Sequence, residues 1–163
     1  MSYKISKISL IDINSYLETL NRTKKKNSLI KKKINRLDHY NWWFKNIKLN
    51  KYCLIKNKKK IIYFWQKKLS AAGGKYFFSG WWPIDDKLEI IDFITMTKIL
   101  LKNSKKHIHV AIISKQNRFS IKLHHYFKFQ QIKKSSKIYN EILNVYYEKT
   151  KIPFSFLIMI KEN

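Results

Sequence analysis

The chain has 163 residues, the length of a single domain, and that is enough to bury a substantial core. Apolar residues make up 45% of the sequence and aromatic residues 15%, which excludes an intrinsically disordered chain in spite of a formal net charge of +25. We therefore expect one folded domain over residues 1–163.

The excess of positive charge has two explanations. There are 35 basic and 10 acidic residues, but Arg occurs only at Arg22, Arg36 and Arg118. Lys in place of Arg is typical of an AT-rich genome, whereas proteins that read bases or clamp phosphates favour Arg. The surface attracts anions in either case, so nucleic acid and phosphorylated small molecules stay open as partners.

Cysteine content and hydropathy bear on the compartment. Cys53 is the only cysteine, so no disulfide forms within the chain, which suits a reducing cytoplasm. Residues 1–20 lack the apolar core of a signal peptide, and the longest apolar run, 154–160, is too short to span a bilayer. We expect a soluble cytoplasmic protein without a membrane span, and the sequence leaves the oligomeric state open.

The first half of the chain predicts a strand, two helices and an antiparallel meander. Apolar residues recur at three- and four-residue spacing in the helices, and β-branched and aromatic residues dominate the strands. In order, the segments are strand 3–11, a helix from about Ser15, a basic loop or solvated helical face at 24–33, helix 37–47, and strands 51–56, 61–69 and 76–82.

The second half alternates helices and strands. Asp86 and Glu89 form a D-x-x-E capping pattern that predicts a helix starting near Asp86. The remaining segments are strand 107–114, helix 117–127, a mixed stretch 129–138, an ambiguous stretch 139–150, and a last strand, 152–161. A strand–helix–strand crossover beside a meander predicts an α/β fold with a mixed sheet.

Residues 110–129 carry the most specific pattern in the chain. A strand-like run is followed by N-x-x-S-x-x-L and a closing aromatic residue, at Asn117, Ser120, Leu123 and Phe129. In its place after a meander and a helix, this segment resembles the GNAT superfamily of acyl-CoA N-acyltransferases, although Lys128 replaces the family's usual Gly. The resemblance implies a mixed, mostly antiparallel sheet flanked by helices.

The resemblance also implies a donor and a set of site residues. The donor would be acetyl-CoA or another acyl-CoA, and the residues at cofactor-binding positions are Trp81, Trp82, Asp86, Lys87, Asn117 and Ser120. His124 stands where many members carry a Tyr that protonates the leaving thiolate, so His124 and its neighbour Tyr126 are the catalytic candidates. Two structural alternatives stay open: Asn117 as a helix cap, and His124 as a surface residue of its helix.

An upstream segment resembles one found in amino-sugar N-acetyltransferases of surface-polysaccharide pathways. His39, Trp42 and Trp43 match H-x-x-W-[WF], and with Trp65 they are the substrate-binding candidates. Aromatic walls beside a histidine suit a sugar or a nucleotide, and packing in the core is the alternative.

The sequence departs from the family at the turn expected to bind the diphosphate of the donor. The family pattern [QR]-x-x-G-x-[GA] is replaced by residues 83–91, which hold no glycine and carry Asp85 and Asp86. Carboxylates repel phosphate, and Pro83 offers no N–H donor.

These observations favour an enzyme. The sequence predicts an N-acyltransferase that moves an acetyl or other acyl group to a primary amine, with a nucleotide-linked amino sugar as the suggested acceptor. The alternative is a catalytically divergent protein of the same fold that binds RNA or another polyanion. His107 and His109 share one strand face but lack a third ligand of suitable spacing, so no metal is expected.

Overall fold

The computed structural model describes residues 2–27, 33–46, 50–71, 74–85, 87–147 and 155–162. The chain divides into two compact units, which we describe separately. Unit 1 comprises Met1–Lys67 and Ser79–Met96, and unit 2 comprises Lys68–Phe78 and Thr97–Asn163.

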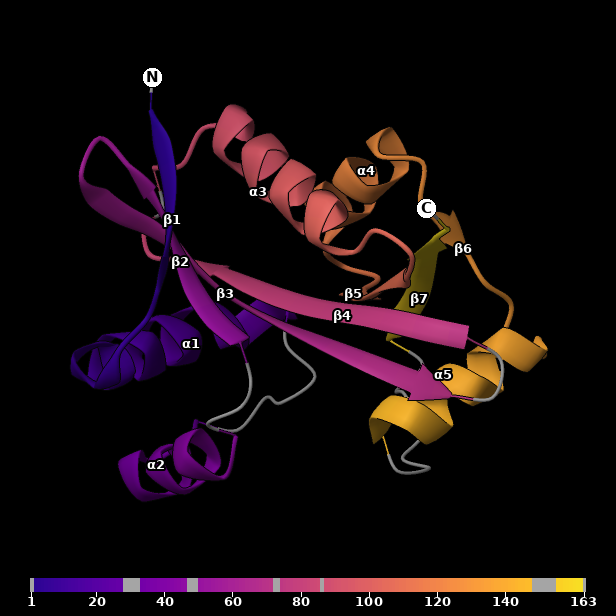
Figure 1. Ribbon diagram of the computed structural model, residues 1–163, viewed down its shortest axis with the longest axis horizontal. Helices are drawn as coiled ribbons and strands as arrows, with labels where there is room; N and C mark the ends of the chain where they lie inside the picture. Colours follow the sequence, from indigo (N-terminus) through magenta and orange to yellow (C-terminus); the bar gives the residue numbers. More distant parts are fainter. Residues whose placement is uncertain are drawn as a thin grey trace. The chain divides into compact units, whose positions relative to one another are not determined.

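The strands form one seven-stranded sheet in the order β1-β2-β3-β4-β5-β7-β6 (Figure 1). Their bounds are β1 Tyr3–Lys7, β2 Asn50–Lys56, β3 Lys59–Ala71, β4 Gly74–Pro83, β5 Ile108–Ser114, β6 Gln130–Gln131 and β7 Phe156–Lys161. The helices are η1 Leu10–Asp12, α1 Ile13–Asn27, α2 Arg36–Lys45, α3 Ile90–Asn103, α4 Arg118–Tyr126 and α5 Lys137–Tyr147. β4 and β5 are parallel, whereas β1–β2, β2–β3, β5–β7 and β6–β7 are antiparallel, so the predicted α/β fold class is confirmed.

In unit 1 the strands β2 and β3 form a tight hairpin. Asn57 and Lys58 have φ angles of 49° and 66°, the left-handed pair that a two-residue type I′ turn requires. Asn tolerates this region better than most residues, because its short polar side chain hydrogen-bonds locally. The turn therefore covers two of the four residues, 57–60, that the sequence suggested.

The core of unit 1 is an aromatic cluster between the strands and two helices. Tyr16 on α1, Trp43 on α2, and Cys53 and Tyr63 on the strands are buried together, with Trp82 packed against them. In Figure 1, α1 and α2 lie on one side of β1–β3. The period-3.6 pattern of the helices and the period-2 pattern of the strands meet in this cluster.

In unit 2 helices cover both faces of β5 and β7. Ala111, Ile113 and Met159 pack with Phe129 on the face that α4 covers. On the other face, the Tyr76 hydroxyl donates a hydrogen bond to the Glu141 carboxylate on α5 at 2.5 Å. The parallel pairing of β4 with β5 runs from Tyr76 opposite Ile108 to Phe78 opposite Val110.

Several predicted boundaries differ from the structure. The first strand ends at Lys7, and α1 continues to Asn27 into the basic stretch. α3 begins at Ile90 rather than near Asp86, and the ambiguous stretch 139–150 contains most of α5. Among the described residues, no helix combines the length and apolar character that a membrane span requires.

Candidate functional site

The start of α4 is fixed by the asparagine of the N-x-x-S pattern. Asn117 is the N-cap residue, and its side-chain Oδ1 accepts a hydrogen bond from the Ser120 backbone N–H at 3.0 Å. Capping satisfies one of the helix's otherwise unpaired N–H groups. Ser120 is buried, and Leu123, the last residue of the pattern, is buried one turn later. The structural role of Asn117 is thus observed, and its predicted contact with a cofactor stays a prediction, as does that of Ser120.

The end of α4 explains why the family has Gly before the closing aromatic. Lys128 has a φ of 63°, the left-handed conformation that terminates many helices and that Gly adopts most easily. Its backbone N–H donates to the His125 carbonyl at 2.8 Å, and the Phe129 N–H donates to the His124 carbonyl at 3.0 Å. Phe129 is then directed into the core, where it is 2% exposed. Lys128 thus adopts a backbone conformation that Gly takes up more easily.

His124, the predicted general acid, is buried beside Phe129. Its Nδ1 lies 2.7 Å from the Ser120 carbonyl oxygen, which can only accept, so Nδ1 carries the proton. The ring of Phe129 meets it edge-on with centroids 4.8 Å apart. Burial lowers the pKa of His124, which keeps the ring neutral and leaves Nε2 as a proton acceptor. The neutral ring can accept a proton at Nε2. To act as the predicted general acid, His124 must first be protonated there.

A second buried histidine, His109 on β5, also contacts Phe129. Its ring meets Phe129 and Phe77 edge-on, at centroid distances of 5.2 and 4.9 Å. Burial, together with the nearby His124, lowers the pKa of His109 to about 3. Sequence reasoning considered His109 only as a metal ligand. By contrast, Tyr126 is 69% exposed, and its ring meets that of Phe127 edge-on at a centroid distance of 5.1 Å.

The turn from β4 to α3 uses its own acids to satisfy backbone donors. The Asp85 carboxylate accepts from the Lys87 backbone N–H at 2.9 Å, and the Asp92 carboxylate accepts from the Glu89 N–H at 2.9 Å. The helix begins at Ile90, with the Asp92 carboxylate reaching back to the Glu89 N–H, so the predicted helix start near Asp86 is wrong. Asp86 lies outside the described residues.

Asp92 is also the centre of a charged network. It is 1% exposed, accepts a hydrogen bond from the Tyr3 hydroxyl at 2.6 Å, and pairs with the Lys56 ammonium at 3.1 Å. Lys56 also pairs with Glu89 at 2.5 Å, and this raises the pKa of Lys56. Burial by itself would raise the pKa of Asp92, but the Tyr3 and Glu89 hydrogen bonds and Lys56 lower it overall. The Lys56 ammonium is therefore paired within the protein.

The predicted substrate-binding aromatics of α2 form part of the core of unit 1. His39 and Trp43 are buried, and the His39 Nε2 lies 3.2 Å from the Ile13 carbonyl. The Tyr16 ring contacts His39, Trp42 and Trp43 at centroid distances of 5.9, 6.4 and 5.4 Å. Packing is thus observed for all three, and substrate contact stays a prediction.

A buried lysine completes this aromatic cluster. The Lys51 ammonium lies over the rings of Trp42 and Trp43, 5.3 and 4.7 Å from their centroids, and donates to the Asn46 carbonyl at 2.6 Å. Burial and the charge of Lys7 lower the pKa of Lys51. Cation–π contact and one carbonyl replace part of the lost hydration of the ammonium.

The remaining predicted tryptophans lie on β3 and β4. Trp82 meets Tyr16 edge-on at 5.4 Å, and Trp81 contacts Phe93 on α3 at 5.3 Å. Trp65 lies so close to Gly80 that a Cβ added there would be 2.6 Å from the indole Nε1. Gly80 is therefore needed for the indole to lie flat on the neighbouring strand.

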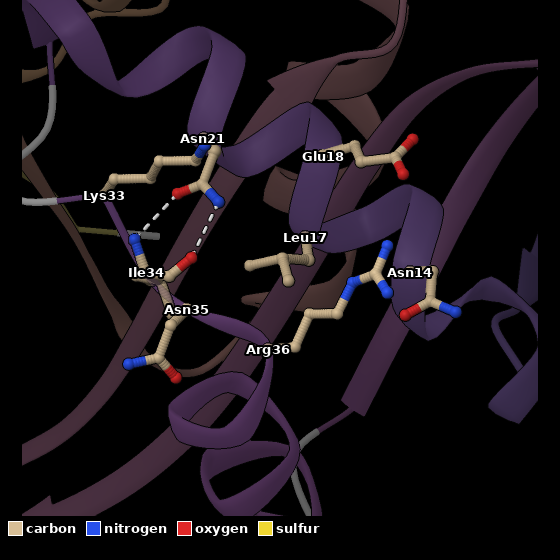
Figure 2. A pocket seen from close by; sticks show the side chains of 8 residues that line it. All are labelled: Asn14, Leu17, Glu18, Asn21, Lys33, Ile34, Asn35 and Arg36. Atoms are coloured by element: carbon tan, nitrogen blue, oxygen red, sulfur yellow. Dashed lines mark hydrogen bonds between the residues drawn. The ribbon is translucent and has the colours of Figure 1, made fainter.

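A cavity that sequence reasoning missed lies in unit 1, between α1 and the segment that leads into α2. It has a volume of about 480 Å³ and is lined by Asn14, Leu17, Glu18, Asn21, Lys33, Ile34, Asn35 and Arg36 (Figure 2). The α1 residues recur at three- and four-residue spacing, so they share one helix face. The spacing of these α1 residues can be read from the sequence, but the sequence does not indicate that residues 33–36 face them.

No group of three or more potential metal ligands was found among the described residues. No model of a protein family matches the chain, and no curated protein matches its sequence.

Solved structures, in contrast, match over the whole chain. A ribosomal-protein-alanine N-acetyltransferase from Brucella melitensis is 15% identical with a TM-score of 0.68, and the match covers 98% of this chain and 99% of that one. A GNAT-superfamily phosphinothricin acetyltransferase from Sinorhizobium meliloti, in complex with acetyl-CoA, is 9% identical with a TM-score of 0.69, and the match covers 99% of this chain and 88% of that one. Apo FdhC, a nucleotide-linked sugar GNAT, is 12% identical with a TM-score of 0.67, and the match covers 98% of this chain and 86% of that one. This chain therefore has the fold of the GNAT-superfamily acetyltransferases, as the pattern in residues 110–129 predicted.

Proposed function

We propose that this protein is an N-acyltransferase that moves an acetyl or other acyl group from an acyl-CoA to a primary amine. The observation that carries the proposal is the segment 117–129. Asn117 caps α4, Lys128 adopts a left-handed conformation at the position of the family's Gly, and Phe129 is buried in the core. The same fold can host many functions, but the fold together with segment 117–129, which the resemblance assigns to acyl-CoA binding, favours acyl transfer among them.

The residues of α4 suggest how a proton is handled. An acyl-CoA supplies an acyl thioester and a thiolate leaving group. The chain's own contribution is a neutral His124 whose Nδ1 is held by a carbonyl, so that Nε2 is the atom that exchanges a proton. Replacement of His124 by Gln keeps a hydrogen-bonding side chain but removes proton exchange, and we expect turnover to fall by roughly 10²–10⁴-fold if the ring acts in catalysis.

For the acceptor, we propose an amino sugar attached to a nucleotide. The support is the H-x-x-W-W segment at 39–43 and the likeness in fold to a nucleotide-linked sugar GNAT. The aromatic residues of this segment pack in the core of unit 1 through Tyr16, so their exposed edges rather than their faces would meet a substrate.

A second candidate function is supported by the β4–α3 turn. Two backbone N–H groups of this turn donate to carboxylates and Lys56 is paired twice, which disfavours a diphosphate there. A protein with this fold and a net charge of +25 that no longer binds the donor would be a binder of RNA or another polyanion.

Thermal unfolding with and without ligand separates the two. A ligand at 100 times its dissociation constant adds about 2.7 kcal/mol to the free energy of unfolding, which raises the Tm of a protein of this size by several degrees. We expect such a shift with acetyl-CoA or a longer acyl-CoA, and thiol release when an amino-sugar nucleotide is added. No shift with any acyl-CoA, together with salt-sensitive retention of RNA, would favour the binding protein instead.

A further inference from the structure

The cavity beside α1 has the properties of a small-molecule site. Its volume, about 480 Å³, lies within the range of roughly 300–1,000 Å³ that ligand pockets occupy. It lies entirely within unit 1, and its walls come from one face of α1 and from residues 33–36 at the entrance to α2. The question is whether it is a preformed site or a packing defect.

Hydrogen bonds hold both walls in place. The Asn21 side-chain amide donates to the Ile34 carbonyl at 2.9 Å, and its Oδ1 accepts from the Ile34 N–H at 3.0 Å, the two bonds drawn in Figure 2. The Tyr40 hydroxyl donates to Asn14 at 2.7 Å, and Asn35 caps α2 through the Asp38 N–H at 2.8 Å. The pocket is therefore shaped before any ligand arrives, which reduces the entropy cost of binding.

These hydrogen bonds also show which groups remain for recognition. The amides of Asn21 and Asn35 and the Oδ1 of Asn14 are used within the protein. Glu18 and Arg36 line the same cavity from opposite walls, and neither side chain makes a hydrogen bond or ion pair with another residue that the structure describes. A carboxylate and a guanidinium that face one cavity without meeting are complementary to a molecule that carries both charges.

The charges and the apolar surface of the lining limit further which class of ligand fits the cavity. Glu18 is one of only 10 acidic residues and Arg36 one of three arginines in the chain, and Lys33 adds a second cation to the lining. A guanidinium binds a carboxylate through two parallel hydrogen bonds, and a carboxylate is the natural partner of an ammonium group. Leu17 and Ile34 offer apolar surface beside these charges.

We propose that this cavity binds a small zwitterion of the α-amino-acid class, with its carboxylate on Arg36, its ammonium on Glu18 and an aliphatic side chain against Leu17 and Ile34. The inference does not depend on acyl transfer, because it concerns binding in the absence of any acyl donor.

Titration calorimetry on the full chain with three matched compounds tests the proposal. L-leucine carries both charges, N-acetyl-L-leucine lacks the ammonium, and L-leucinamide lacks the carboxylate. A hydrogen bond to a charged group contributes about 1.5–3 kcal/mol, so we expect L-leucine to bind about tenfold or more tightly than either capped compound. Equal affinity for L-leucine and N-acetyl-L-leucine would mean that the basic surface attracts any carboxylate, and would overturn the proposal. The absence of saturable binding would also overturn it.

Variants locate the site. Arg36→Gln should weaken L-leucine binding about tenfold or more, and Glu18→Gln should abolish the preference over N-acetyl-L-leucine. Lys45→Gln is the matched control, because it removes one positive charge from the same helix at an exposed position outside the cavity. Equal weakening by Lys45→Gln would contradict the assignment. In amide NMR spectra, L-leucine should shift the side-chain signals of Asn14 and Asn21, and shifts confined to other residues would place the ligand elsewhere.

Discussion

The segment around α4 and the turn before α3 depart from the family pattern in opposite ways. Around α4 a residue is changed and the backbone is kept, since Lys128 adopts the left-handed conformation that Gly would adopt. Before α3 the residues are changed, and the Asp85 and Asp92 carboxylates accept hydrogen bonds from the Lys87 and Glu89 N–H groups. A substitution therefore disproves a resemblance only when it removes the atoms on which the function depends.

His109, which contacts Phe129 after α4, and Asp92, in the first turn of α3, should affect stability in different pH windows. The effect of His109 is the largest that we predict. The pKa of His109 is about 3 in the folded protein against 6.5 for the free side chain, because burial disfavours the imidazolium. Between these values the unfolded state binds more protons than the folded state, so the stability contributed by His109 is complete above pH 6.5 and is lost as the pH falls towards 3. The loss reaches about 5 kcal/mol, at about 1.4 kcal/mol per pKa unit.

Urea unfolding at a series of pH values measures this slope. His109→Gln should flatten it between pH 6.5 and 4, whatever the variant's absolute stability. The lowered pKa of Asp92 acts differently, because its stabilisation is present above the ordinary carboxyl pKa of 3.8 and is lost only below it. An unchanged slope in His109→Gln would show that His109 titrates normally.

The second prediction compares Asp85 in the β4–α3 turn with Asp92 in the first turn of α3. Asp92→Asn removes the charge from a buried group that binds Tyr3, Lys56 and the Glu89 N–H, and we expect a loss of about 3 kcal/mol in the free energy of unfolding. Asp85→Asn affects an exposed side chain with a single backbone bond, so its effect should stay within about 0.5 kcal/mol. Denaturant midpoints measure both, and similar losses would mean that the network around Asp92 adds nothing.

The sequence predicted those features of the fold that depend on residues close together in the chain, and it missed those that depend on contacts between distant residues. The meander, the crossover and the cap at Asn117 depend on patterns within a few residues, and they were predicted with the correct order and type. The late start of α3 was not, because it depends on Asp92 reaching back to Glu89 while Tyr3 and Lys56, far away in sequence, stabilise the carboxylate. The D-x-x-E pattern at Asp86 was locally plausible, and only these tertiary contacts decide against it.

The candidate site shows the same limit. The resemblance to the family singled out His124, but it could not reveal that its Nδ1 is held by the Ser120 carbonyl or that it shares Phe129 with a second buried histidine, His109. The cavity beside α1 was missed because one of its walls is the irregular segment 33–36, which has no periodicity to detect.

The smallest expected effect tests whether the turn after α4 still favours Gly. In a left-handed conformation a residue with a Cβ is strained by about 1–2 kcal/mol, whereas Gly is not, although Gly loses more chain entropy on folding. Because Lys128 is exposed with a φ of 63°, we expect Lys128→Gly to stabilise the protein by about 1 kcal/mol in thermal or urea unfolding. Lys128→Ala is the matched control, since it removes the same charge but keeps the Cβ, and it should bring no gain. If Ala stabilises as much as Gly, then relief of charge repulsion rather than backbone strain governs this position, and the likeness of the turn to the family's G-F would be a matter of shape without energetic consequence.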